Sequence, residues 1–284
     1  MKRIISLCVL LGFLLAWADD RPAPTPARTQ ASDIRRIGEV GLGVEYYHYK
    51  EPRVMSISGP MLNLYGFMGV IKNSFRFQTD FYFATHVGAN IYDGAIMNLN
   101  NNTITPYKTQ STDFYVGGAP KIGFGIFRGG RDLLFAYVGL GYRFLSNLAI
   151  DAPNMKTSYR RYQGYLYLPI GLSGELPLSS GFSLTASSEY RILLFGHNAS
   201  MMSDLGFDDD LFFRQNSGYG TRVTWGGKFY VKNGSALKLD IYCDYWDIKA
   251  SNVVAAYKHG VFQGNFTEPK NFTLALGLML GYRF

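Results

Sequence analysis

From about Gly38 to the last residue, hydrophobic and polar positions alternate along the chain with a period of two. The final segment is the clearest case, because one set of alternate positions is entirely apolar or aromatic. That set comprises Phe272, Leu274, Leu276, Leu278, Leu280, Tyr282 and Phe284. Successive side chains of a β-strand point to opposite faces, so this alternation predicts strands and not helices.

Turn signals divide the alternating region into ten segments, which we predict to be strands. Their ranges are about 38–50, 53–71, 74–92, 110–127, 132–147, 160–176, 181–197, 216–231, 235–250 and 270–284. Four connections are tight, at residues 72–73, 128–131, 177–180 and 232–235. The connections between them are long and polar, at about 93–109, 148–159, 198–215 and 251–269, except that the first, at residues 51–53, is short.

Two features of these segments indicate a closed barrel that spans a membrane. Short turns that alternate with long loops, on an even number of strands, are typical of such barrels. The segments, of about 13 to 19 residues, are also longer than the five or six residues usual for strands. We therefore expect an all-β fold: a transmembrane antiparallel up-and-down β-barrel, closed, of about ten strands. The alternative is a secreted soluble barrel or sandwich with its apolar faces inward, because periodicity alone does not identify the inner face.

The first 18 residues have the three parts of a secretory signal peptide. A positive start precedes an apolar run that is shorter than the roughly 20 residues of a transmembrane helix. Residues 16–18 then form a small-x-small cleavage site. Residues 19–37 are rich in proline and are expected to be a disordered periplasmic segment. Residues 38–284 are expected to form the barrel domain.

Composition and charge argue against several kinds of binding and catalytic site. Aromatic residues make up 16% of the chain and charged residues 17%, a mixture that suits a half-buried sheet. Cys243 is the only cysteine after the signal peptide, so no intramolecular disulfide is expected. The net charge of +7 is spread along the chain, so nucleic acid is not an expected partner. The four histidines lie on different segments, so neither a metal site nor a cofactor is predicted.

The last five positions of the apolar set are Phe284, Tyr282, Leu280, Leu278 and Leu276. In this the chain resembles the bacterial outer-membrane β-barrel proteins of Gram-negative cells, whose last strand ends in an aromatic residue with apolar residues at alternate positions before it. In that family the strand is the signal recognised by the barrel-assembly machinery. The resemblance therefore implies an outer-membrane location and that assembly partner, but no subfamily and no activity.

If the apolar faces meet lipid, the other faces line the interior, where we count eight acidic and eight basic side chains. Balanced charge predicts ion pairs in the lumen, because a selective pore would show a bias of one sign. The residues expected in these pairs are Glu45, Arg76, Asp80, Arg143, Glu189, Arg191, Arg222, Lys228, Asp240 and Asp244. Barrels of about eight strands are just filled by side chains, so ten strands are expected to leave the lumen mostly filled. A narrow channel, a porin for small solutes, is the alternative.

Basic residues near the predicted outer rim suggest contact with lipopolysaccharide. Arg160, Arg161 and Arg53 could hold its phosphates, since Arg–phosphate hydrogen bonds are strong. Charges that merely mark solvated strand ends are the alternative interpretation.

A hydrolase at the outer rim is a second alternative, because His197 begins a loop that also holds Ser200, Asp204 and Asp208. The ten strands are similar to those of the omptin proteases, which place an Asp-His pair and two further Asp residues at the rim. Their Asp-x-His spacing is absent, since Phe195 stands two residues before His197. The His-x-Ser pattern of the lipid A deacylases is absent too. We therefore expect no enzymatic activity.

The sequence thus predicts an integral outer-membrane barrel with a mostly filled lumen. Its expected role is envelope integrity or surface interaction through the outer loops. The expected partners are outer-membrane lipids, lipopolysaccharide, the assembly machinery, and host or surface ligands. Neither the ligand nor the oligomeric state is indicated.

Overall fold

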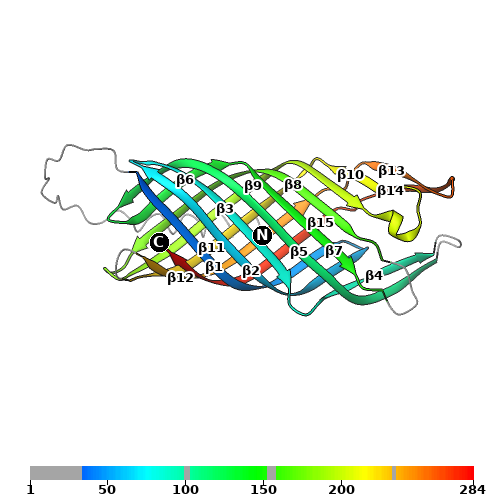
Figure 1. The fold of residues 1–284 in the computed structure, drawn as a ribbon, viewed down its shortest axis with the longest axis horizontal. Helices are drawn as coiled ribbons and strands as arrows, with labels where there is room; N and C mark the ends of the chain where they lie inside the picture. The colour runs from blue at the N-terminus through cyan, green and yellow to red at the C-terminus, as the bar shows by residue number, and fades with distance from the viewer. Residues whose placement is uncertain (1–33, 99–102, 152–157, 232–234) are drawn as a thin grey trace, which may run out of the picture. The chain divides into compact units, whose positions relative to one another are not determined.

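The computed structural model describes residues 34–98, 103–151, 158–231 and 235–284, which form one barrel of long, tilted strands (Figure 1). Ten antiparallel strands make the wall, and the fifth is interrupted at Leu140. They are β1 (Arg35–Glu51), β2 (Met55–Lys72), β3 (Phe75–His86), β5 (Thr103–Arg128), β6 (Arg131–Gly139) with β7 (Gly141–Ala149), β8 (Arg161–Pro177), β9 (Phe182–Ser200), β11 (Gly218–Tyr230), β12 (Ala236–Ile248) and β15 (Asn271–Arg283). The predicted all-β, closed, antiparallel barrel is confirmed.

The barrel closes because the last strand pairs with the first. β15 and β1 are in register from Glu39 opposite Arg283 to Lys50 opposite Phe272. At the end of this seam, the backbone N–H of Phe284 donates to the carbonyl of Gly38 at 3.0 Å. A closed wall leaves no open sheet edge, which is the condition for placing strands in lipid.

The two faces of the wall have opposite character. Leu42, Leu278 and Leu280 lie on the outer face with 68%, 51% and 60% of their surface exposed. Charged side chains such as Glu39 and Asp240 point inward and are buried. The soluble alternative, with apolar faces inward, is therefore wrong. In the described residues, no helix is long and apolar enough to cross a membrane.

Aromatic rings on the outer face form two bands. One is a series of ring contacts across five strands, through Tyr190, Tyr219, Tyr245, Phe272 and His48. The other lies toward the tight turns and includes the pairs Phe75–Phe124, Phe182–Phe229 and Tyr282–Phe284. Along β15, Phe272 lies in one band and Phe284 in the other. At a rise of ~3.3 Å per residue and a tilt of ~40°, the two bands are about 30 Å apart along the barrel axis. This matches the hydrocarbon thickness of a bilayer, about 30 Å.

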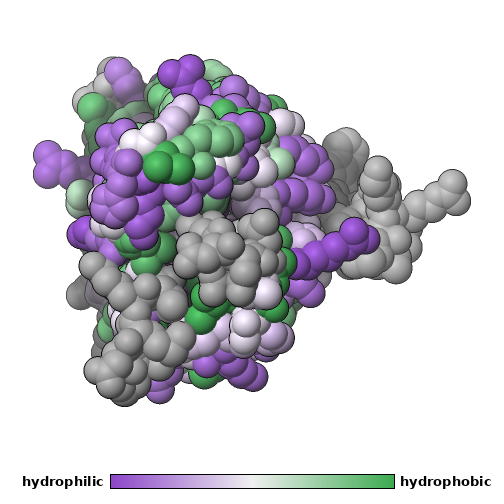
Figure 2. Space-filling view, turned by 90° about the vertical axis from the view of Figure 1, so that its right-hand side faces the viewer, coloured by the Kyte–Doolittle hydropathy of each residue, from purple (hydrophilic) through white to green (hydrophobic). Residues whose placement is uncertain are grey.

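The two ends of the barrel differ. We call the end with the tight turns, such as the one between Arg128 and Arg131, the turn end, and the opposite end the loop end. At the loop end, the segments predicted as long loops contain regular structure. β4 (Asn90–Asn98) pairs with β5, β10 (Leu211–Gln215) pairs with β9, and β13 (Val253–Lys258) pairs with β14 (Val261–Thr267). Hydrophilic side chains dominate the view of this end in Figure 2.

A small core stabilises part of the loop end. It joins the 3-10 helix η1 (Met202–Leu205) to β10 and β13. Its buried members are Met202, Phe207, Leu211, Phe213 and Ala256. The segments 198–215 and 251–269, predicted as long polar connections, thus contain regular structure and bury apolar side chains against one another.

Other predicted boundaries also shift. The third segment, predicted over 74–92, ends at His86, and Gly88 with φ 75° turns the chain into β4. β1 begins at Arg35, inside the segment 19–37 that was expected to be disordered. The predicted signal peptide at 1–18 lies outside the described residues, as do residues 99–102, 152–157 and 232–234 of the predicted connections.

Candidate functional site in the barrel interior

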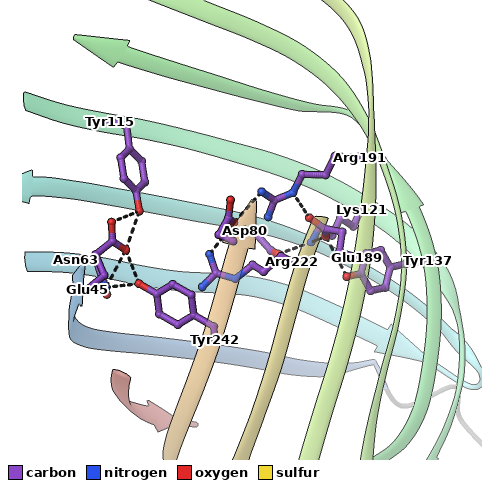
Figure 3. A network of polar contacts seen from close by, with 11 residues as sticks. Glu45, Asn63, Asp80, Tyr115, Lys121, Tyr137, Glu189, Arg191, Arg222 and Tyr242 are labelled. Carbon is purple, nitrogen blue, oxygen red and sulfur yellow. Dashed lines mark hydrogen bonds and ion pairs between the residues drawn. The ribbon is translucent and has the colours of Figure 1, made fainter. Parts of the chain in front are cut away.

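The middle of the lumen holds a network of six charged side chains (Figure 3). Lys121 on β5 donates to Asp80 at 2.7 Å and also to Glu189. Arg191 donates to Glu189 at 2.6 Å and to Asp244 at 2.8 Å, and Arg222 lies 3.3 Å from the same Asp244 carboxylate. Three cationic and three anionic side chains are thus in contact, and together they come from five strands. The network crosses the lumen and is electrically neutral.

With the described residues, Glu45 does not form the ion pair that was predicted for it. Its carboxylate accepts hydrogen bonds from the hydroxyl of Tyr115, at 2.7 and 2.8 Å, and from the hydroxyl of Tyr242. The amide of Asn63 lies 3.4 Å away (Figure 3). Among the described residues, no cation lies within salt-bridge distance of Glu45. Neutral donors thus satisfy this buried carboxylate, as buried polar groups require.

Arg143 likewise forms no ion pair with a described residue, although one was predicted. Its guanidinium lies 4.7 Å from the ring of Tyr115 and 5.4 Å from that of Trp246. Arg191 approaches Trp246 from another strand at 5.3 Å. Cation–π contacts are strongest away from water, and Arg143 is 2% exposed.

Toward the loop end, a layer of buried aromatic and aliphatic side chains lies in the lumen. We call this layer the aromatic plug. Trp246 is at its centre, 6.1 Å from the ring of Tyr165 and 5.2 Å from that of Tyr167. The plug comprises Tyr47, Tyr49, Met55, Ile57, Met61, Ala84, Tyr115, Leu145, Tyr165, Tyr167, Leu193, Trp246 and Ile248. Several of these residues are 0–1% exposed, so their side chains are not in contact with solvent.

Toward the turn end, the lumen widens into a cavity of about 140 Å³. Its walls carry Asp132, which accepts hydrogen bonds from Arg76 at 2.8 Å, from Arg35 at 3.3 Å and from Arg283. Three further pairs line it: Lys228 with Glu175 at 2.7 Å, and Lys238 with Glu39 and Asp240 at 3.2 and 2.9 Å. Asp132, which stands beside a tight turn, was not among the inward acids predicted from the sequence.

Comparison with solved structures finds bacterial outer-membrane barrels. The outer membrane protease OmpT of Escherichia coli aligns with a TM-score of 0.61 and 12% identity, over 91% of this chain and 99% of that one. The toluene transporter TodX of Pseudomonas putida gives 0.36 and 8% over 90% of each chain. The β domain of the Bordetella autotransporter BrkA gives 0.38 and 10%, over 87% of this chain and 98% of that one. No protein-family model and no curated protein matches the sequence.

The chain has the fold of the bacterial outer-membrane β-barrels. At 12% identity, the likeness to OmpT is a likeness of fold and carries no activity with it. In outer-membrane barrels, short turns face the periplasm and longer loops face outward. By this rule we name the loop end of this barrel its outer end and the turn end its periplasmic end.

At the outer end of the barrel, Arg161 is buried in an ion-pair cluster. It lies 2.5 Å from Glu51 and also binds Glu268, in the segment between β14 and β15. Burial raises the pKa of Glu268 to about 7; the negative charge of Glu51 adds to this rise and Arg161 opposes it. Arg161 is 7% exposed, which removes it from the predicted contact with lipopolysaccharide.

The other two arginines of that prediction are exposed. Arg160 is bound to Asp204, with Nε–Oδ2 and Nη2–Oδ1 distances of 3.0 and 2.8 Å. These hydrogen bonds raise the pKa of Arg160 above its ordinary value. Arg53 lies in the turn between β1 and β2 with φ 68°. Contact of Arg53 and Arg160 with lipopolysaccharide stays a prediction.

The residues considered for a rim hydrolase are occupied by other contacts. His197 lies on the outer face of β9, where its Nε2 is 2.9 Å from the hydroxyl of Tyr142. Asp208 accepts hydrogen bonds from the backbone N–H groups of His259 and Gly260 at 2.7 and 2.8 Å, which lower its pKa. Across the described residues, no group of three or more His, Cys, Asp and Glu side chains is arranged to hold a metal ion.

Proposed function

We propose that this protein is an integral outer-membrane barrel that conducts no solute and acts at the cell surface through its outer hairpins. Its role would be adhesion or another surface contact, or envelope integrity. The aromatic plug around Trp246 is the observation that carries this proposal. A pore needs a continuous polar path, and the plug interrupts the lumen with rings that are 0–1% exposed.

The outer hairpins support the second half of the proposal. Polar loops on a rigid scaffold are common sites of recognition. The β13–β14 hairpin rests on the small core that includes Phe207 and Ala256. It projects Tyr257 and Phe262, which are 47% and 53% exposed, at the outer end. Such rings supply contact area at low entropic cost when a partner binds.

Planar-bilayer recording tests the closed lumen. The purified barrel should insert without adding steady conductance above the lipid background. Steady, large, ion-selective conductance would overturn the proposal and favour the narrow channel.

A binding assay tests the surface role. Replacing residues 253–267 by a short turn should leave the barrel folded, because this hairpin lies outside the wall, and should weaken binding to immobilised lipopolysaccharide or to host cells. For lipopolysaccharide, Arg53→Ala should weaken binding, whereas Arg36→Ala, an exposed arginine at the periplasmic end, serves as the matched control. Unchanged binding by both outer variants would remove the outer hairpins from the proposal.

The proposal includes no catalytic step. His197→Ala provides the check, because a rim hydrolase would need this imidazole. A hydrolytic activity of the wild-type protein that the His197→Ala variant lacks would replace the proposal with the rim-hydrolase alternative.

A further inference from the structure

Charge is unevenly distributed in the periplasmic half of the lumen. Three guanidinium groups, of Arg35, Arg76 and Arg283, converge on the single carboxylate of Asp132. We call these four residues the arginine tripod. It carries two positive charges in excess. By contrast, Lys228 and Glu175 balance each other, and Lys238 with its two acids has one negative charge in excess.

The tripod is held rigidly. Arg76 lies between the rings of Phe67 and Phe135, at 5.0 and 4.6 Å from their centres, and Arg283 lies 5.6 Å from the same Phe67. Such cation–π contacts help to fix the positions of the guanidinium groups. Each guanidinium has five donors, and the buried Nε of Arg76 has no hydrogen-bond partner among the described residues. Donors therefore remain free for a further acceptor.

The cavity beside the tripod extends from Asp132 and Arg283 to Tyr167 of the plug. At the periplasmic end, the side chain of Arg35 is 34% exposed, whereas those of Asp132, Arg283 and Arg76 are 10%, 12% and 5% exposed. On the other side, Trp246 of the plug is 1% exposed. The cavity of about 140 Å³ is lined by Arg76, Asp132 and Arg283. Arg35 therefore connects the tripod to solvent at the periplasmic end, and the plug separates the tripod from the outer end.

The rim of the periplasmic end favours anions. Arg36, Lys72 and Arg128 are exposed there, whereas the acidic residues of the adjoining strand ends that the structure describes are all buried. A mouth with exposed charge of one sign concentrates ligands of the opposite sign.

We propose that the arginine tripod is a binding site for a small oxyanion, of the size and charge of phosphate, that enters from the periplasm. The oxyanion would accept hydrogen bonds from the free guanidinium N–H groups and would neutralise the two excess positive charges. Arg–oxyanion hydrogen bonds are charge-assisted and strong. Buried, uncompensated charge is costly, so the bound anion would also stabilise the barrel.

Arg35 and Arg36 provide a matched pair for the test. They are adjacent on β1, but Arg35 points into the lumen and reaches Asp132, whereas Arg36 is exposed on the outer face. Inorganic phosphate is titrated into the full-length barrel in a zwitterionic detergent, with binding followed by calorimetry and by the midpoint of thermal unfolding. Sodium chloride at equal ionic strength is the reference. Arg35→Gln should weaken phosphate binding about five- to tenfold, the loss of one charge-assisted contact, and Arg36→Gln should not change it.

The variant Asp132→Asn distinguishes phosphate binding by the tripod from a purely structural role of the tripod. Removing this carboxylate raises the excess charge of the tripod, so phosphate should bind the folded variant more tightly. If chloride stabilises the wild type as much as phosphate does, or if Arg35→Gln and Arg36→Gln bind phosphate equally, the tripod is only a structural closure and the proposal fails. Should Asp132→Asn not fold, the Arg35 and Arg36 pair alone decides.

Discussion

Trp246→Ala is expected to open the lumen of the barrel. The indole lies at the centre of the aromatic plug, in contact with the rings of Tyr165 and Tyr167 and with the guanidinium groups of Arg143 and Arg191. Below it the periplasmic cavity extends up to Tyr167, Arg191 and Arg222. Truncation at this position therefore leaves a gap in the layer that separates the cavity from the outer end.

The expected cost to stability follows from burial. Trp246 is 1% exposed, and truncation of a buried Phe or Trp to Ala costs about 3–5 kcal/mol. The Nε1 atom has no hydrogen-bond partner among the described residues, so the loss is one of packing and cation–π contact. Trp225→Ala is the control, because Trp225 is 50% exposed on the lipid-facing surface of β11. Its loss should cost less, about 1–2 kcal/mol.

Two measurements check this expectation. Urea unfolding in lipid vesicles gives the change in the free energy of unfolding for both variants, and planar-bilayer recording gives their conductance. Trp246→Ala should be the less stable variant and should show conductance that wild type and Trp225→Ala lack. If Trp246→Ala unfolds like Trp225→Ala and stays closed, the plug does not depend on Trp246, and the account of the closed lumen is wrong.

Three further predictions concern the outer rim, the lumen and the seam. The pKa of Glu268 is raised to about 7, so the folded state holds a proton that the unfolded state has lost between about pH 4.5 and 7. Stability should therefore fall as the pH rises through this window, and urea midpoints at pH 5 and pH 8 should differ less for Glu268→Gln than for wild type. Tyr242→Phe removes a donor to the buried Glu45 and should cost about 1–3 kcal/mol in urea unfolding; a loss within error would mean that water replaces the hydroxyl. Deleting Phe284, which closes the seam between β1 and β15, should impair membrane insertion in cells, whereas Phe144→Leu should be tolerated; equal insertion of the two would refute this.

The barrel wall could be predicted from the sequence because its signal is local. Alternation places Leu276, Leu278 and Leu280 on one face and Ala275 and Met279 on the other, whatever lies across the barrel. The same rule identified the inward charges. It could not identify their partners, since contact across the lumen depends on strand tilt and stagger. Glu45 is therefore paired with tyrosines from β5 and β12, which no local pattern indicates.

Departures from regular alternation explain other errors. The pairing of β5 with β6 shifts register between Ile126 and Phe127, next to the turn that precedes Asp132. The pairing of β8 with β9 shifts between Leu166 and Tyr167, and Leu194 and Phe195 are both exposed as a result. A bulge adds one residue to one strand only. Its position depends on the neighbouring strand, which the sequence of a single strand does not contain.

The charged side chains of the lumen help to select the register in which the strands pair, even though their ion pairs add little stability. Buried ion pairs add little net stability over apolar packing, because desolvation offsets their attraction. A slip of β12 by one residue would nevertheless turn Lys238, Asp240 and Asp244 toward lipid and Leu239 and Ile241 toward the lumen. A lysine or arginine on the lipid face costs about 2–4 kcal/mol at the bilayer midplane, and acids cost less. Summed over strands that each carry inward charges, this penalty excludes slipped pairings, so the interior network selects the register of the wall even where each pair contributes little by itself.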